Sequence, residues 1–432
     1  MYSSIVLSVL QAKKINEFDF VKIESKGIVF EGLLLPRSDV GSPDCLVLKL
    51  SSGYNVGLRF EKEMKIEKKG SFEKKEVKPL NFKSKEGVPK IVLISTGGTI
   101  ASKVDYETGG VKALSSVDEL LSQFPELTEC VEITKVLTPF NVMSEDVSSE
   151  NWIELAEVIE KEVGSCDGVI VTHGTDFLSY TASALAFLLP SLTKPVLLIG
   201  AQRSPDRPSF DGAMNLVCAA RFVKSGFKGV AVVMHATSND DYCFAHKPVK
   251  VRKMHSSRRD AFRSINDSPL AKIYPDGKIV NLQVFPDSSA FSSKKKFGKV
   301  FVLKSFPDSD PKIIDFLVGE GYKGIIIEAS ALGHVPTNNK NSWIPFIEKA
   351  VKKGVFVGVV TQCLYGRVKP EVYSNLRKLK KTGAVFLRDG LPEAMFVKLS
   401  WALAQGKNVE KLMLENLVGE FNDKLTQEMF LN

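Results

Sequence analysis

Residues 91–99 read IVLISTGGT, an apolar run that ends in hydroxyl side chains and two glycines. A short apolar run bounded by a turn is typical of a strand that is buried on both faces. Residues 168–176 read GVIVTHGTD and follow the same order, with a carboxylate after the last hydroxyl. Because parallel α/β sheets bind ligands at the carboxyl ends of their strands, the two loops predict one shared site.

Further apolar runs alternate with helical patterns beyond these loops. We expect strands at 196–199 and 230–234, and helices at 151–163 and 178–188. That alternation predicts parallel strands joined by helical crossovers, which is an α/β fold. We assign 91–290 to this domain and expect it to carry the catalytic residues.

A second alternation follows a polar, lysine-rich interruption around residues 274–299. It predicts a second, smaller α/β domain at 297–432 with a largely parallel sheet. Its strands are expected at 300–303, 324–327, 355–360 and 384–387, with helices around 343–352 and 392–404.

The first part of the chain carries short strand patterns separated by turn-forming residues instead. These patterns predict a small β-barrel at 1–60. Residues 61–90 alternate lysine and glutamate with few apolar side chains. They are too polar to build a core, so we interpret them as a charged linker.

The composition of the 432-residue chain, with 44% hydrophobic and 25% charged residues, is that of a globular protein with several domains. Its longest apolar stretches, such as 182–189, are far shorter than the roughly 20 residues of a membrane span. We expect a cytoplasmic protein without a secretory signal. The six cysteines and five histidines form no metal-binding pattern, so no bound metal is expected. The net charge of +8 favours anionic partners but does not identify nucleic acid.

The loop after the first strand could be a plain turn or a phosphate cradle, but it lacks the G-x-G-x-x-G and G-K-[ST] patterns of nucleotide sites. Instead, the two loops resemble the T-G-G-T-I and T-H-G-T-D motifs of the bacterial-type asparaginase and glutaminase family. The resemblance extends through NVMSED at 141–146, GAQRSP at 200–205 and DGAMNL at 211–216. It covers about residues 90–410 and implies two asparaginase-like α/β domains that release ammonia from a carboxamide.

The resemblance also implies catalytic roles. Thr99 matches the nucleophile, Tyr106 the tyrosine of a lid loop, and Thr175 and Asp176 the second threonine with its carboxylate. A threonine hydroxyl is a weak nucleophile that needs a neighbouring base, which a lysine can supply when an acid orients it. Which threonine attacks first stays open.

The family's lysine matches Lys253 rather than Lys247 or Lys250. The block KMHSSRRDAF at 253–262 fits the family's lysine segment without a gap. Substitution of the other two lysines is therefore expected to be mild.

Substrate contacts are implied for Ser144 and Glu145, in the segment that holds the substrate's α-carboxylate, and for the turns at Gly98 and Gly174. Glu145 stands where many relatives carry an uncharged amide. Asparagine and glutamine differ by one methylene, typically worth only about 1 to 3 kcal/mol of discrimination, so these motifs leave the preferred amide open.

Several of these residues also have a purely structural interpretation. Thr175 and Asp176 suit the N-cap of the helix that follows. His173 invites a role as general base, but a structural role fits the motif better. Tyr106 alone is an ordinary loop tyrosine, and the basic run 247–263 alone is a solvated face.

The N-terminal extension bears on the wider function, since free-standing asparaginases have little before their two α/β domains. With GLLLP at 32–36 and SGYNVG at 52–57, it resembles the D subunits of archaeal glutamyl-tRNA(Gln) amidotransferases. The resemblance implies a glutaminase subunit that passes ammonia to an E-type partner. That partner is expected to use ATP and Mg²⁺ to convert glutamyl-tRNA(Gln) to glutaminyl-tRNA(Gln), in an assembly of two D and two E subunits.

No cofactor is implied in this chain itself. The main alternative is a free-standing cytoplasmic L-asparaginase. A non-enzymatic α/β ligand-binding module is the weakest hypothesis, because binding alone does not require two threonines, an acid and a lysine together.

Overall fold

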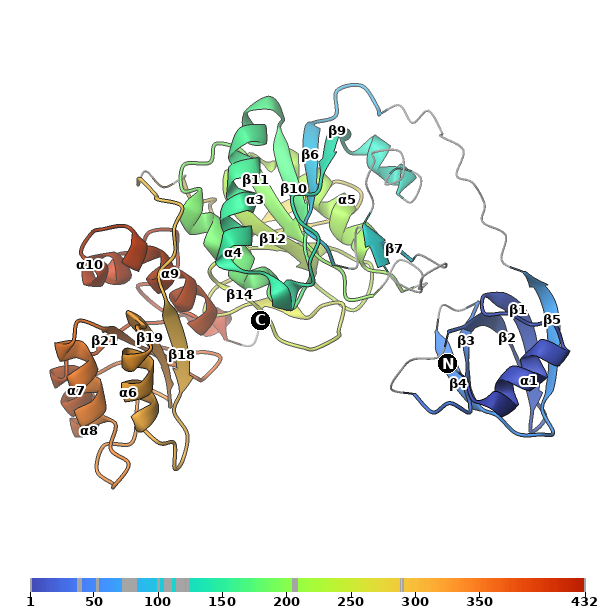
Figure 1. The fold of residues 1–432 in the computed structure, drawn as a ribbon. Coiled ribbons are helices and arrows are strands. Elements are labelled where there is room, and N and C mark those ends of the chain that lie inside the picture. Colours follow the sequence, from blue (N-terminus) through green and yellow to red (C-terminus); the bar gives the residue numbers. More distant parts are fainter. Residues whose placement is uncertain are drawn as a thin grey trace.

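The computed structural model describes residues 2–36, 41–51, 54–71, 84–98, 102–104, 111–113, 121, 124–203, 209–287, 289 and 291–430, with the backbone alone for 102–104 and 111–113. These residues form an N-terminal β unit and two α/β domains (Figure 1). None of the described helices has both the length and the apolar character that a membrane span requires.

The N-terminal unit is a five-stranded antiparallel sheet in the order β4-β3-β2-β1-β5. Alternate residues of β1, among them Val21 and Ile23, enter a core that helix α1 completes with Val6 and Leu10. The edge strands β4 and β5 are not paired with each other in the described residues. The elements are α1 Ser4–Ala12, β1 Asp19–Ser25, β2 Ile28–Leu35, β3 Cys45–Leu50, β4 Asn55–Arg59 and β5 Lys65–Ser71.

Two elements of this unit differ from the sequence expectation. Strand β5 lies inside the stretch 61–90 that was interpreted as a linker, and it pairs antiparallel with β1. Only Ile66 of β5 is buried, so this edge strand lacks the alternation that marks a strand in sequence. Helix α1 was not expected, and it begins where the Ser3 hydroxyl accepts a hydrogen bond from the Val6 N–H.

The first α/β domain contains an eight-stranded sheet in the order β17-β16-β13-β12-β11-β10-β6-β9. The strands from β12 to β9 are parallel, as expected, whereas β13, β16 and β17 extend the sheet antiparallel. That extension was not predicted, because its strands are only three or four residues long. The strands are β6 Lys90–Ser95, β9 Glu132–Leu137, β10 Gly168–Thr172, β11 Pro195–Ile199, β12 Gly229–His235, β13 Cys243–His246, β16 Ala271–Ile273 and β17 Ile279–Asn281.

Helices cover both faces of this sheet. Alternate residues of the buried strands face α3 and α4 in one core and α5 in the other. Separate hairpins, β7–β8 and β14–β15, lie outside the large sheet. The remaining elements are α3 Ser149–Glu162, α4 Leu178–Leu188, α5 Gly212–Phe222, β7 Ser102–Val104, β8 Val111–Ala113, β14 Val251–Lys253, β15 Phe262–Ser264 and the short 3-10 helices η1 Pro125–Glu129, η2 Ser144–Asp146, η3 Val163–Ser165 and η4 Val223–Ser225.

The second α/β domain has the expected four parallel strands, in the order β18-β19-β20-β21. One face packs against α6, α7 and α8, and the other against α9. The elements are β18 Val300–Lys304, α6 Lys312–Gly319, β19 Gly324–Ala329, α7 Ile344–Lys352, β20 Phe356–Thr361, α8 Ser374–Lys381, β21 Val385–Phe386, α9 Pro392–Ala404, α10 Val409–Leu414 and η5 Gln427–Met429.

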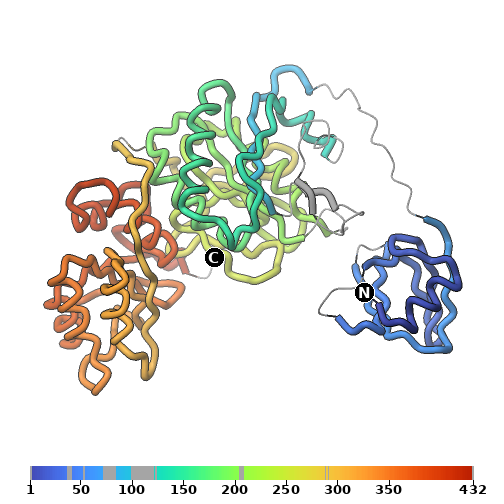
Figure 2. The backbone as a smooth tube through the Cα atoms, viewed as in Figure 1, coloured from blue at the N-terminus to red at the C-terminus, as the bar shows by residue number. Residues whose placement is uncertain are grey.

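The two α/β domains share one hydrophobic core, because α9 packs against α4 of the first domain. Phe187 of α4 stacks on Trp401 of α9 with ring centroids 5.5 Å apart. Beyond α10 the chain returns to the first domain (Figure 2). There Asn422 Nδ2 donates to the Asn266 carbonyl at 2.6 Å. The α/β fold class is confirmed, and its two domains are joined through packed helices.

Candidate active site

The two glycine loops meet at the carboxyl edge of the large sheet. Strand β10 pairs in parallel with both β6 and β11, so that Thr172 lies opposite Ser95 and Ile199. This register brings the three following loops to one edge. The Thr96 N–H donates to the Thr172 carbonyl at 3.1 Å, which ties the first loop to the second.

Backbone-to-backbone contact between the loops requires glycine. A Cβ on Gly98, whose φ is +80°, would lie 2.7 Å from the Gly174 nitrogen. A Cβ on Gly174 would lie 2.8 Å from the Cβ of Ser144. Ser144 is buried in η2, so the predicted substrate segment contacts the second loop directly. Gly98, Gly174 and Ser144 are thus brought together.

The predicted lysine reaches the same place from the β14–β15 hairpin. Lys253 Nζ donates to Thr175 Oγ1 at 2.8 Å and to Asp176 Oδ1 at 2.6 Å. The Lys253 side chain is 13% exposed and that of Asp176 is 63% exposed. The ammonium is therefore sheltered, whereas the carboxylate remains open to a ligand from solvent.

The other two candidate lysines have different partners. Lys247 Nζ lies 2.8 Å from Asp267 Oδ2, and Lys250 Nζ lies 2.7 Å from Asp389 Oδ2. Of the three, only Lys253 contacts the second threonine loop in the described residues. Lys250 is a fully buried member of an ion pair, so the expectation that its substitution would be mild does not take account of this burial.

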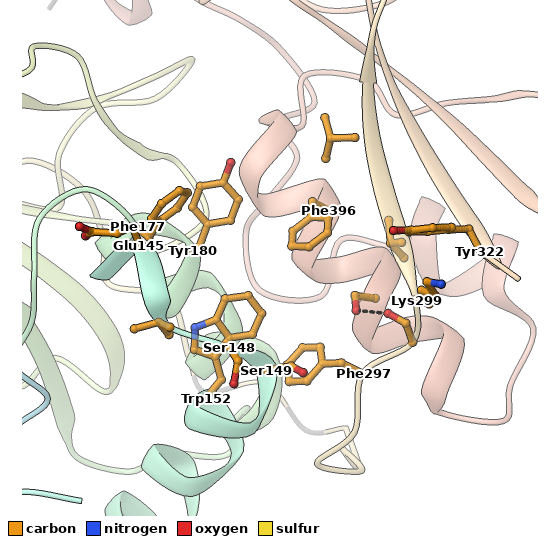
Figure 3. Close-up of a pocket in the computed structure, with 15 residues that line it drawn as sticks. Glu145, Ser148, Ser149, Trp152, Phe177, Tyr180, Phe297, Lys299, Tyr322 and Phe396 are labelled. Carbon is orange, nitrogen blue, oxygen red and sulfur yellow. Dashed lines mark hydrogen bonds between the residues drawn. The ribbon is translucent and has the colours of Figure 1, made fainter. Parts of the chain in front are cut away.

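Thr99 and Tyr106, the predicted nucleophile and lid tyrosine, lie outside the described residues. Glu145 is exposed beside the buried Ser144. It lines a cavity of about 660 Å³ between the two α/β domains. Figure 3 shows Trp152 and Tyr180 on one side of this cavity facing the second domain's Phe396 on the other.

The N-cap interpretation of the second loop does not hold. Helix α4 has Phe177 at its N-cap position and no side-chain hydrogen bond caps it. The oxygens of Thr175 and Asp176 instead accept hydrogen bonds from Lys253.

His173 has a structural role, because it stabilises the second glycine loop through hydrogen bonds. Its Nδ1–H donates to the Gly174 carbonyl at 2.7 Å, and its Nε2 accepts from the Thr181 hydroxyl at 2.9 Å. The Trp152 Nε1–H donates in turn to that hydroxyl at 3.0 Å. Burial lowers the pKa of His173 to about 4, so the imidazole is neutral near pH 7. The chain of hydrogen bonds fixes the glycine turn on α4.

Thr175 packs against a loop whose contacts were not predicted from the sequence. A Cβ on Gly200 would lie 2.6 Å from Thr175 Cγ2, so only glycine fits there. Asn215 Nδ2 holds the Gly200 carbonyl at 2.9 Å, and buried Asp211 accepts hydrogen bonds from the backbone of Gln202 and its neighbour. The motifs at 200–205 and 211–216 were the signal, although their contacts were not predictable.

Family models match most of the chain. Residues 15–68 match the GatD N-terminal domain, 90–285 the asparaginase N-terminal domain and 299–413 the glutaminase/asparaginase C-terminal domain.

Full-length relatives are similar throughout. The chain is 46% identical to the D subunit of the glutamyl-tRNA(Gln) amidotransferase from Pyrococcus abyssi, covering 95% of this chain and 96% of that protein. It is 44% identical to the corresponding protein of Pyrococcus furiosus, covering 98% of each. The solved structure of the thermostable L-asparaginase from Thermococcus kodakarensis superposes with a TM-score of 0.71 at 27% identity, covering 78% of this chain and all of that one. The chain therefore belongs to the family of glutamyl-tRNA(Gln) amidotransferase D subunits, which is built on the asparaginase fold.

Proposed function

We propose that this chain is the glutaminase subunit of a tRNA-dependent amidotransferase. It hydrolyses glutamine to glutamate and ammonia, and an E-type partner uses the ammonia to convert glutamyl-tRNA(Gln) to glutaminyl-tRNA(Gln). The observation that carries the hydrolytic part is the contact of Lys253 Nζ with Thr175 Oγ1 and Asp176 Oδ1, at 2.8 and 2.6 Å.

In the proposed mechanism a threonine hydroxyl, assigned to Thr99, attacks the side-chain amide carbon. The hydroxyl proton is taken up through Thr175 and Lys253, and the amide nitrogen leaves as ammonia after gaining a proton. Water then hydrolyses the ester that remains on the threonine. Backbone N–H groups of the two glycine turns stabilise the oxyanion, a contribution of about 3 kcal/mol per donor.

Asp176 has two tasks in this mechanism. It orients Lys253 through the 2.6 Å contact, and its exposed carboxylate pairs with the α-ammonium of the substrate. The contacts of Lys253 Nζ with both Thr175 Oγ1 and Asp176 Oδ1 place the lysine where it can exchange a proton with the threonine pair. Ser144 and Glu145 are assigned to the substrate's α-carboxylate end.

The subunit role is supported by the N-terminal unit. The aligned asparaginase covers 78% of this chain, whereas the amidotransferase relatives cover nearly all of it. The name of those relatives supports a complex that acts on glutamyl-tRNA(Gln). The proposed assembly contains two D and two E subunits, and we propose that it is cytoplasmic. ATP and Mg²⁺ belong to the partner in this proposal.

Ammonia release measured with the purified chain tests the hydrolytic assignment. We expect slow release from glutamine by the chain alone, faster release with the partner and glutamyl-tRNA(Gln), and none from a Thr99→Ala variant in either case. Substantial turnover by Thr99→Ala would remove Thr99 as the nucleophile. Full activity toward asparagine without partner or tRNA would favour a free-standing asparaginase.

A further inference from the structure

Two ion pairs attach the β14–β15 hairpin, which carries Lys253, to the second α/β domain. Neither ion pair has a role in the mechanism proposed above. Lys250 Nζ lies 2.7 Å from Asp389 Oδ2, with both side chains fully buried. Arg252 Nε lies 3.1 Å from Glu393 Oε1. Asp389 follows β21 and Glu393 lies in the first turn of α9. Both acids therefore belong to the segment that packs the second domain against the first.

No large sheet holds this hairpin, so its position depends on the burial of Val251 and Phe262 in the core and on such anchors. Strands β14 and β15 form a two-stranded sheet of their own, with only three residues each. An isolated two-stranded ribbon is marginally stable without packing. Side chains alternate along a strand, so the neighbours Arg252 and Lys253 of β14 point to opposite sides, and Lys250 lies in the turn just before this strand. The anchored side faces the second domain, and the opposite side delivers the lysine to Thr175.

We propose that Lys250, Arg252, Asp389 and Glu393 are positioning residues that place Lys253 Nζ against Thr175, so that the second domain takes part in amide hydrolysis through the position of this lysine. The inference rests on the proposed function, because it assumes that Lys253 handles the proton.

The Lys250–Asp389 pair has the geometry of a fixed support. Lys250 Nζ also donates to the Asp389 carbonyl at 3.2 Å, and the Asn422 N–H donates to Asp389 Oδ1 at 3.1 Å. These directional bonds hold both partners in one place. Glu393 is buried, and its Oε2 has no hydrogen-bond partner in the described part of the chain, which leaves Arg252 as its charge partner there.

Stability alone is a weak explanation for charges buried in this way. A buried ion pair often stabilises a protein no more than apolar residues of similar size, since both charges lose their hydration. Fixing a single arrangement is the better-supported use of such pairs. A catalytic group has to be held within about 0.5 Å of its working position. Ion pairs beside Lys253 that fix one arrangement of the hairpin would meet this requirement.

Removing both charges of a pair together tests the inference without leaving a buried charge alone. We would compare two double variants, Arg252→Met/Glu393→Gln and Lys250→Met/Asp389→Asn, with the unsubstituted chain. All are full-length and bound to the partner subunit. The asparagine at 389 keeps an acceptor for the Asn422 N–H. Arg258→Met is the control, because this exposed residue of the same hairpin pairs only with Asp260 in the described residues. The readouts are kcat and KM for glutamine, with the thermal unfolding midpoint.

The double variants are expected to keep a thermal midpoint near that of the unsubstituted chain and to lose kcat by on the order of 10²-fold, as for a misplaced catalytic group. KM should change much less, because the substrate contacts are retained. Arg258→Met should preserve both constants. Wild-type kcat in both double variants would overturn the inference.

A crystal structure of Arg252→Met/Glu393→Gln gives a readout that does not depend on activity. We expect Lys253 Nζ to lie beyond hydrogen-bonding distance of Thr175 Oγ1. Retention of the 2.8 Å contact would overturn the positioning role even if kcat fell. If the unsubstituted chain released no ammonia from glutamine or asparagine, the proposed function would fail. The distance from Lys253 Nζ to Thr175 Oγ1 in the variant would still decide whether the ion pairs position Lys253.

Discussion

Lys253 is the residue on which the proposed chemistry depends most. Lys253→Met removes the only cation that contacts Thr175 in the described residues, so we expect kcat to fall by about 10² to 10⁴, the usual range for a positioned acid or base. Lys247→Met is the matched control, since its Nζ pairs with Asp267 instead. Glutamine hydrolysis by both variants is the measurement. A comparable loss in both would count against the assignment.

Lys250 has a different importance, for stability. A single Lys250→Met substitution leaves the Asp389 carboxylate buried without its cation, which typically costs about 3 to 5 kcal/mol. We therefore expect a large drop in the thermal unfolding midpoint, which the Lys250→Met/Asp389→Asn pair largely reverses. An unchanged midpoint in the single variant would contradict the ion pair's burial.

His173 makes the stability of the fold depend on pH. Its pKa is about 4 in the folded chain against an ordinary 6.5, because burial disfavours the imidazolium. Below pH 6.5 His173 binds a proton in the unfolded chain but stays neutral in the folded chain. The contribution of neutral His173 to the free energy of unfolding is therefore complete above pH 6.5 and is lost as the pH falls toward 4. The free energy of unfolding falls by about 3 kcal/mol over this range. Thermal midpoints across this range should fall less steeply for His173→Asn, and equal slopes would disprove the assignment.

Single residues of the site could be predicted where a short motif contains them. Thr175 and Asp176 are adjacent in sequence, and a gap-free segment match led to Lys253. Thr99 and Tyr106 stay predictions. The pairing of Lys250 with Asp389 could not be predicted, because 139 residues separate them and neither position belongs to a recognisable motif.

At the scale of elements, the site depends on loops that touch through their backbones. Gly174→Ala would bring a methyl group within 2.8 Å of the Ser144 Cβ, so the loops must separate. Overpacking of this kind costs about 1 to 3 kcal/mol, and we expect glutamine hydrolysis to fall at least tenfold. Gly164→Ala is the control, because nothing lies within 4 Å of its added Cβ. Kinetics of both variants test the claim, and normal activity in Gly174→Ala would refute it.

Elements were predictable in proportion to how completely they are buried. Strands β6, β10 and β11 are buried on nearly every residue and read as continuous apolar runs. Strand β5 buries only Ile66, and β17 buries none of its residues, so no hydrophobic pattern distinguished them from loops. Their place in a sheet depends on neighbours that are distant in sequence.

At the scale of the whole molecule, the two α/β domains form one structure and the N-terminal unit has a core of its own. Helices α4 and α9 share a cluster, whereas the described N-terminal residues cluster separately. A chain that begins at residue 84 should therefore fold and keep the thermal midpoint of the α/β part. Calorimetry of the shortened chain is the measurement, and failure to fold would show that the units depend on each other.

The central claim is that ammonia released at the Thr175, Asp176 and Lys253 site is delivered to tRNA-linked glutamate. Glutamine labelled with ¹⁵N at its amide, incubated with the chain, its partner subunit, ATP, Mg²⁺ and glutamyl-tRNA(Gln), tests this directly. The account predicts ¹⁵N in the side-chain amide of glutaminyl-tRNA(Gln), and none when Lys253→Met replaces the unsubstituted chain. Glutaminyl-tRNA(Gln) formed without ¹⁵N, or labelled equally with Lys253→Met, would contradict it.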